Sequence, residues 1–297
     1  MAQAALAYLE RARILDHALD RYVANDEGGL LFFYVSSVDL AMHMMWRHTD
    51  PDHPFFDEAI ANEASNWWSD REGSTWRDVV DDLYLKMDPF LGKVLDRVGD
   101  EAVVMIMSDH GFAAYRRKFS LNTWLLENGY LVLNEGRERE LPEGASGFED
   151  VFISDAVDWS KSTAYGVGFN GLYLNLKGRE AQGIVESGAE ANELLGRLKR
   201  ELEAIRDDDR GSEQVVLSAD LATDVYAGGE RLDEAPDIVV GYNWGYGNSD
   251  EATQGRIPAA VLSDNVGGTF NGSHLMHPSV VNGVLLTNQP VQLADPR

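Results

Sequence analysis

A short apolar run that ends in charged residues constrains the fold of this chain more than any other feature. Residues 101–112 read EAVVMIMSDHGF, in which an apolar run over 103–107 is followed almost directly by Asp109 and His110. Such a run predicts a buried strand, and ligands of open α/β sheets bind beyond the carboxyl ends of the strands. We therefore expect Asp109 and His110 to lie at the centre of a functional site.

A second apolar run leads to another candidate site. Residues 30–35 read LLFFYV and follow a turn-forming stretch, which predicts a strand that is buried on both faces, as in a parallel sheet. The next stretch, VDLAMHMMW, carries Asp39 and His43, which are four residues apart. On a helix this spacing places both side chains on one face. Asp39 and His43 therefore form the second candidate site.

Helical and strand patterns alternate along the whole chain. Helices are expected over residues 3–24, 76–98 (with a kink or break at Pro89), 120–129 and 189–207, and further strands in a hairpin around 170–171 and over 214–217, 237–241 and 283–288. Polar stretches near 47–75 and 135–162 are expected to be surface inserts. We therefore predict one α/β domain over residues 1–297, built on a largely parallel central sheet.

Charge and composition argue against several functional classes. The chain has 50 acidic and 25 basic residues, a formal net charge of −25, which disfavours binding to a nucleic acid polymer. Cysteine is absent, so that a transition metal would be held by histidine and carboxylate side chains. No stretch predicts a signal peptide or a membrane span, which favours the cytoplasm without fixing the compartment. The oligomeric state stays open.

Metal-ligand chemistry gathers in a small set of side chains. These are Asp39, His43, Asp109, His110 and His274, the last in the glycine-rich stretch NGSHLMHP. Histidine and carboxylate without cysteine suit zinc, and suit manganese or iron less well. Two such metal ions about 4 Å apart serve hydrolytic phosphoryl transfer. Taken singly, however, an aspartate and a histidine four residues apart on a helix are more often a cap or a surface pair.

The order of the motifs resembles a known family. The blocks are FYVSSVDLAMHMMW, VVMIMSDHGF, RRKFSLNTWLLENGYLVL, GLYLNLKGREAQGIV, APDIVVGYNWGY and GSHLMHPSVVNGVLL. In this succession they resemble the alkaline phosphatase superfamily, and more closely its type I phosphodiesterase/nucleotide pyrophosphatase branch. The resemblance covers residues 13–288. It implies a three-layer α/β domain that hydrolyses phosphoesters or phosphodiesters of small phosphorylated molecules with the help of metal ions.

The resemblance also implies a ligand set for two divalent metal ions, most suitably zinc, with manganese or iron as alternatives. Asp39, His43 and His274 would hold the first ion, and Asp109 and His110 the second. In the family the second ion also binds an aspartate from the first strand and a Thr or Ser nucleophile at a helix start. No stretch of this chain matches that block. We therefore expect a fragment that lacks the nucleophile-bearing strand and ends before the family's last helix.

Two other functional classes stay open. A phosphomutase of the same superfamily would return the phosphoryl group to a substrate hydroxyl. A catalytically inactive metal-binding or interaction module would explain the missing nucleophile.

A few further side chains have a possible role in the site. Arg116 and Arg117 follow the Asp109 turn and would bind a phosphate in a bidentate manner, or else form ordinary ion pairs. His277 is an alternative ligand to His274. Further polar residues are assigned to ordinary positions: His48 and His53 to a surface loop in the first insert, and Ser120 or Asn122 to the cap of the helix that follows.

Overall fold

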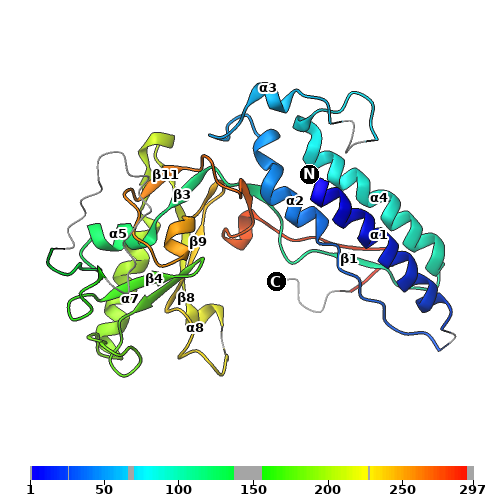
Figure 1. The fold of residues 1–297 in the computed structure, drawn as a ribbon. Helices are drawn as coiled ribbons and strands as arrows, with labels where there is room; N and C mark the ends of the chain where they lie inside the picture. Colours follow the sequence, from blue (N-terminus) through cyan, green and yellow to red (C-terminus); the bar gives the residue numbers. More distant parts are fainter. Residues whose placement is uncertain (1, 26, 66–69, 137–155, 227, 293–297) are drawn as a thin grey trace. The chain divides into compact units, whose positions relative to one another are not determined.

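The computed structural model describes residues 2–25, 27–65, 70–136, 156–226 and 228–292 (Figure 1). The chain divides into two compact units. Unit 1 comprises Met1–Ala114, Val266–His274 and Asn282–Arg297, and unit 2 comprises Tyr115–Asn265 and Leu275–Val281. Each unit is described by itself below. The single catalytic domain predicted over residues 1–297 stays a prediction.

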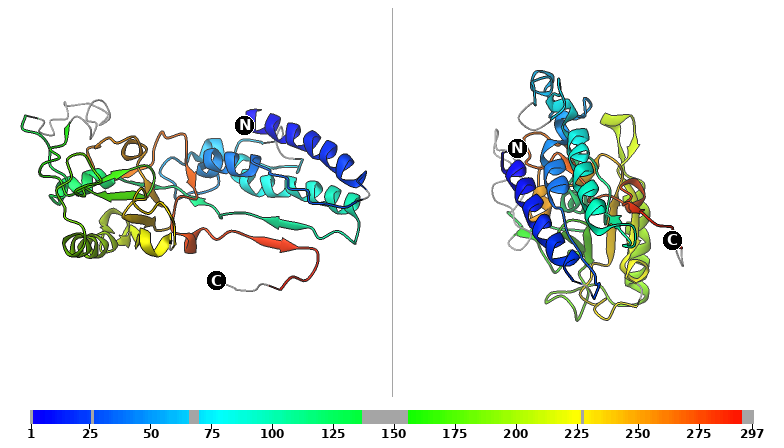
Figure 2. Two further views of the ribbon diagram at one scale, coloured as in Figure 1. Left: turned by 90° about the horizontal axis from the view of Figure 1, so that it is seen from below. Right: turned by 90° about the vertical axis from the view of Figure 1, so that its right-hand side faces the viewer.

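Three helices form the body of unit 1. They are α1 (Ala2–Val23), α2 (Ser37–Met45) and α4 (Val79–Val98), which contact one another pairwise (Figures 1 and 2). Their apolar faces meet around Ala41, Met42 and Leu83. Helices α1 and α4 were predicted from their periodicity, and α4 runs through Pro89 without a break before it ends at Gly99, whose φ of 73° suits glycine. The short helices η1 (Trp46–His48), α3 (Glu58–Ala61) and η2 (Trp76–Asp78) complete this part.

Unit 1 also contains two short antiparallel strand pairs. Strand β1 (Met105–Met107) pairs with β13 (Leu285–Thr287), as Figure 2 shows, and β2 (Ala113–Ala114) pairs with β12 (Gly272–Ser273). The second pair matters for the site, because it brings the end of the 101–112 motif beside the stretch that carries His274.

The two apolar runs of the sequence analysis are not buried as expected. The strand predicted over residues 30–35 is not found, and Leu30 and Phe32 are 92% and 76% exposed. Met105 in β1 is 53% exposed, and β13 is its only described neighbour. Burial on both faces requires a strand on each side and covering layers, whereas among the described residues β1 has a single neighbouring strand and residues 30–35 have none.

Unit 2 is built around a four-stranded antiparallel sheet. Its strand order is β4 (Ala164–Val167), β5 (Gly171–Leu174), β9 (Ile238–Tyr242) and β8 (Val216–Leu221). Helix α7 (Ala189–Glu203) packs on β8 through Leu194, Leu198 and Leu202, which are all buried, and α5 (Leu121–Glu127) packs on β4. The hairpin around 170–171 and both helices agree with the sequence predictions.

The other strands of unit 2 are short. A three-stranded sheet has the order β10 (Tyr246–Asn248), β3 (Arg117–Phe119) and β11 (Leu262–Asp264), and β6 (Arg206–Asp207) pairs with β7 (Glu213–Gln214). The short helices are η3 (Asp208–Arg210), α8 (Ala222–Val225), α9 (Asp250–Thr253) and η4 (Pro278–Val280).

The largely parallel central sheet was not found. Among the named strands of the described chain, β10 and β3 form the only parallel pair. The mixed α/β composition was predicted correctly. The direction of pairing was not, because a short apolar run predicts a strand but carries no information about its neighbour.

Two smaller expectations also need correction. His48 and His53 were placed on a surface loop, but both side chains are buried within unit 1. Asn122 does not cap α5, whose N-cap position is Ser120; its buried amide instead bonds both main-chain groups of Gly166. Most of the insert predicted near 135–162 lies outside the described residues. Among the described helices, none combines the length and apolar character needed to cross a membrane.

Candidate metal centre

Four of the predicted ligands converge in unit 1. Asp39 lies in the first turn of α2 and His43 in its last turn. His110 follows β1, and His274 follows β12. Asp39 and His274 are 235 positions apart in the sequence. The pairing of β12 with β2, together with the contact of β12 with α2, brings these distant segments together.

The carboxylate of Asp39 lies at the centre of the cluster. Its Oδ1 atom is 3.7 Å from His43 Nε2, 3.9 Å from His110 Nε2 and 3.7 Å from His274 Nε2. These separations exceed a hydrogen bond but match the roughly 4 Å or less expected between atoms that share a metal at about 2 Å each. Oδ1 is buried, and within the described part of the chain it has no hydrogen-bond partner. A cation would satisfy it.

The orientation of two imidazoles suits metal binding. His43 donates from Nδ1 to the carbonyl oxygen of Gly272 at 2.9 Å, and His110 donates from Nδ1 to that of Gly111 at 2.8 Å. A carbonyl oxygen only accepts hydrogen bonds, so Nδ1 is the donor, and in the neutral imidazole this leaves the lone pair on Nε2. Outer-shell bonds of this kind are typical of histidines that bind metals through Nε2.

The third imidazole is held in its neutral form. The ring of His274 stacks on that of His110, with centroids 3.5 Å apart and an interplanar angle of 11°. Burial lowers the pKa of His274 to about 4, and the neighbouring His110 and His43 act in the same direction. His274 is therefore neutral near pH 7, which is the state that a metal requires.

Aromatic side chains border the cluster. Phe112 meets the rings of His43 and His274 edge-on at centroid distances of 4.8 and 5.6 Å, and it stacks on Trp46. Phe270 lies 5.0 Å from His43. These rings place apolar surface against the imidazoles of the cluster. Sequence reasoning missed both phenylalanines, because an aromatic residue beside a motif carries no signal of its own.

One compact group of candidate ligands divides the predicted set differently. Among the described residues, Asp39, His110 and His274 form a ligand group whose donor atoms all lie within 4.8 Å of one another. His110 was predicted to pair instead with Asp109 at a second ion. Asp109 is 87% exposed, and its Oδ1 lies 3.6 Å from His110 Nε2. A carboxylate with neutral imidazoles is a donor set that zinc, manganese and iron all accept.

The two arginines belong to unit 2. Arg117 is buried and donates to Asp207 at 2.7 and 2.9 Å and to Asp264 at 2.9 Å, and these carboxylates raise its pKa further above its usual value. This geometry fits the ion-pair alternative for Arg117. The guanidinium of Arg116 lies over the ring of Trp244. Contact of either arginine with substrate stays a prediction.

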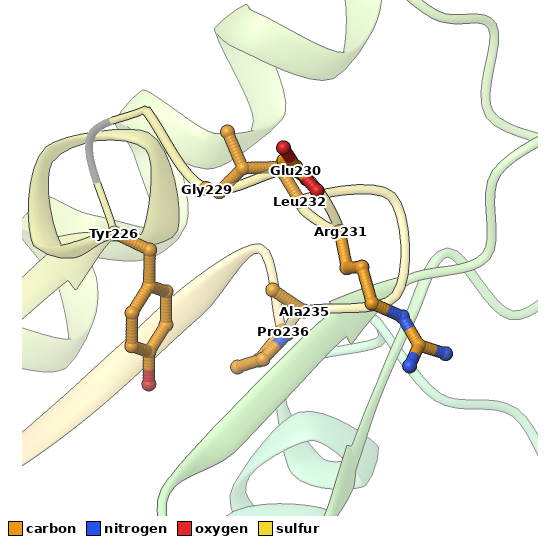
Figure 3. A pocket seen from close by; sticks show the side chains of 7 residues that line it. All are labelled: Tyr226, Gly229, Glu230, Arg231, Leu232, Ala235 and Pro236. Carbon is orange, nitrogen blue, oxygen red and sulfur yellow. The ribbon is translucent and has the colours of Figure 1, made fainter.

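Other candidate positions in unit 2 show no metal chemistry. His277 bonds Ser279 through Nδ1 at 2.7 Å, and its Nε2 lies 3.9 Å from Asp220, so it has partners within its own unit. A surface hollow of about 580 Å³ lies beside α8, lined by residues 226, 229–232, 235 and 236 (Figure 3). Its described lining contains no histidine and no group of metal ligands, and we assign it no role.

Comparison with protein families decides the broader assignment. A family model described as type I phosphodiesterase / nucleotide pyrophosphatase matches residues 4–266. The chain belongs to this family. Comparisons with curated proteins and with solved structures gave no match. The match includes Asp39, His43, Asp109 and His110 and ends before His274, so the place of His274 in the cluster comes from the structure.

Membership of the type I phosphodiesterase / nucleotide pyrophosphatase family indicates the general class of reaction. The family supports an enzyme that acts on phosphodiester or pyrophosphate bonds of small phosphorylated substrates. The family is generally metal-dependent, in agreement with the possible Asp/His/His cluster of unit 1.

Proposed function

We propose that this chain carries the metal centre of a metal-dependent phosphohydrolase that acts on phosphoesters or phosphodiesters. The observation that carries the proposal is the buried, unsatisfied Oδ1 of Asp39 among three imidazole Nε2 atoms. A carboxylate oxygen buried without a partner is costly, and a bound cation would remove that cost. A surface pair or a helix cap would not need the histidines from two other segments.

Each side chain of the cluster has a defined part in this proposal. Asp39, His110 and His274 bind the ion, and His43 directs its Nε2 toward the same carboxylate while Gly272 fixes its ring. Phe112 and Phe270 shield one side of the cluster. When bound, the metal supplies Lewis-acid stabilisation of the phosphoryl oxygens and lowers the pKa of a bound water. We assign no nucleophile.

The number of ions is part of the proposal. The family resemblance implies two, with Asp109 and His110 at the second, whereas the most compact ligand group holds one. An exposed Asp109 beside His110 is in a position to add a ligand once the first ion is bound. We propose zinc as the metal and expect the stoichiometry of binding to separate one ion from two.

The first test removes the central carboxylate. Asp39→Asn keeps the size of the side chain but loses its charge, so we expect the rise in thermal midpoint on adding zinc to disappear. Hydrolysis of an activated aryl phosphodiester or monoester should fall with it. Asp16→Asn is the matched control, because Asp16 is a half-exposed aspartate of unit 1 that pairs with Lys93 on the helix surface.

The outcomes separate the alternatives. An unchanged response to zinc in the Asp39→Asn variant would contradict the metal centre. Zinc binding by the natural chain without turnover of either substrate would favour the metal-binding module. Transfer of a labelled phosphoryl group to a second hydroxyl, rather than to water, would favour the phosphomutase.

A further inference from the structure

Asn271 precedes His274 by three residues and contacts α2, but it is not one of the candidate ligands. Its side chain is 2% exposed. Its Oδ1 accepts a hydrogen bond from the main-chain nitrogen of Arg47 at 2.9 Å, and its Nδ2 donates to the carbonyl oxygen of Met44 at 2.8 Å. Its own main-chain nitrogen donates to the carbonyl oxygen of His43 at 2.7 Å. One buried asparagine thus bonds three main-chain groups where α2 passes into η1.

Two of these hydrogen bonds pair carbonyl groups at the C-terminal end of α2. The last carbonyl groups of a helix have no partner within it, and α2 ends at Met45. Asn271 supplies two donors to His43 and Met44 from a segment more than 220 positions away in sequence. The same residue therefore caps the helix that carries Asp39 and anchors the segment that carries His274.

The neighbouring glycine shows how close this contact is. A Cβ atom on Gly272 would lie 2.6 Å from the carbonyl oxygen of Met42 and 2.8 Å from Phe112 Cε1. Real Cβ atoms do not approach so closely, so the main chain of β12 rests directly on α2. The carbonyl oxygen of Gly272 also holds the ring of His43. The segment 271–274 is thus fixed by its main chain and by the Asn271 side chain.

We propose that Asn271 is a positioning residue of the metal centre, which sets the separation between Asp39 on α2 and His274 three residues along the chain. This inference rests on the proposed function, because it needs the cluster to bind a metal. Metal–ligand distances tolerate deviations of only about 0.2 Å. Three residues of chain span at most about 10 Å, so a displacement at 271 reaches His274.

The expected change in zinc affinity follows from the general behaviour of residues that orient metal ligands. Loss of a group that orients a metal ligand typically lowers metal affinity about 10- to 100-fold. Asn271→Ala removes the side-chain hydrogen bonds to Arg47 and Met44, and leaves the Met44 carbonyl and the Arg47 amide without this partner. We expect the zinc dissociation constant of this variant to rise by 10- to 100-fold. The zinc-induced rise in thermal midpoint should shrink accordingly.

Asn271→Asp provides a second variant of nearly the same size. It keeps the acceptor for Arg47 but replaces the donor to Met44 by a carboxylate oxygen. A negative charge near the cluster would by itself strengthen zinc binding, whereas a positioning role predicts weaker binding. The direction of the change therefore separates position from charge. The Asp variant also keeps the test decisive if the Ala variant does not fold.

Asn288→Ala is the matched control. Asn288 also lies in unit 1, and its amide also bonds two main-chain groups far away in sequence, the nitrogen of Val104 at 2.8 Å and the oxygen of Ala102 at 3.0 Å. It contacts none of the cluster residues through these bonds. We expect this variant to lower the metal-free thermal midpoint while its zinc affinity stays that of the natural chain.

The experiment measures zinc affinity by chelator competition and the thermal midpoint with and without zinc for all four proteins. Weaker zinc binding in both Asn271 variants, with unchanged affinity in Asn288→Ala, is the expected result. Natural affinity in the Asn271 variants, with only a lower metal-free midpoint, would overturn the positioning role and leave the metal centre intact. Absence of zinc binding by the natural chain would overturn the metal centre itself and this inference with it.

Discussion

At the scale of single residues, the sequence motifs named side chains that lie close together in the structure, although the grouping differs from the predicted one. Asp39 and His274 were expected within about 4 Å of each other, and their side chains lie 3.7 Å apart. The sequence could not show that His110 would join them, because its nearest sequence neighbour, Asp109, is the more obvious partner. Asn271 was not recognised at all, since an asparagine before a glycine predicts a turn and not a buried side chain that bonds distant main-chain groups. The role of these residues as ligands stays a prediction.

The buried histidines predict how stability depends on pH. Burial, with the positive charge of Arg47, lowers the pKa of His48 to about 4, and the pKa of His274 is also about 4. In the unfolded chain both groups titrate near their ordinary value of about 6.5. Above that pH both imidazoles are neutral in the folded and in the unfolded state, so their titration does not change the free energy of unfolding. As the pH falls from about 6.5 to 4, the unfolded state binds protons that the folded state does not, so stability is lost.

The thermal midpoint of the metal-free protein should therefore fall as the pH is lowered from about 6.5 to 4. Below about pH 4 these two groups should cause no further change in stability. His48→Gln should make the fall shallower, because one of the two linked groups is gone. The exposed His17 offers a control, and His17→Gln should leave the profile unchanged. A His48→Gln profile that is as steep as that of the natural protein would contradict the assignment.

At the scale of secondary structure elements, helices were easier to predict than strand pairing. The periodicity of α1, α4 and α7 located each helix to within a few residues, because one apolar face repeats along the helix itself. Strand partners depend on the rest of the fold. The run at 30–35 forms no strand and the run at 103–107 forms only the three-residue β1, and both leave apolar side chains exposed, since an apolar run carries no information on whether neighbouring strands are present.

Strand β3 provides an element-scale prediction in unit 2. Arg117 on β3 links the β6 residue Asp207 to the β11 residue Asp264. Asp207 is itself buried, so Arg117→Ala would leave an unpaired carboxylate inside the unit. Removal of one partner of a buried ion pair typically costs about 3–5 kcal/mol. Urea denaturation should show a loss of this order, and the zinc response of unit 1 should persist.

Arg116→Ala serves as the comparison for this prediction. Arg116 stacks on the exposed Trp244, and cation–π contacts at exposed sites contribute about 0.5–1 kcal/mol. We expect a distinctly smaller loss of stability than for Arg117→Ala. Equal losses would mean that the carboxylate network around Arg117 contributes no more than a surface contact.

At the scale of the whole molecule, the candidate metal centre depends on contacts between distant parts of the sequence. Its ligands come from residues 39–110 and from His274, and most of unit 2 lies between them in the chain. Closing so long a loop costs conformational entropy. A metal ion that binds both segments only in the folded state would offset part of that cost, which is why zinc is expected to raise the thermal midpoint of the whole protein.

The central claim is that Asp39 and the histidines around it bind a metal ion, and X-ray absorption at the zinc edge tests it most directly. The untagged protein, loaded with one equivalent of zinc, should show a shell of nitrogen and oxygen ligands at about 2.0–2.1 Å with the multiple scattering that imidazole rings produce. Asp39→Asn should lose this signal. A spectrum of zinc bound by oxygen ligands alone, without imidazole scattering, would contradict the account.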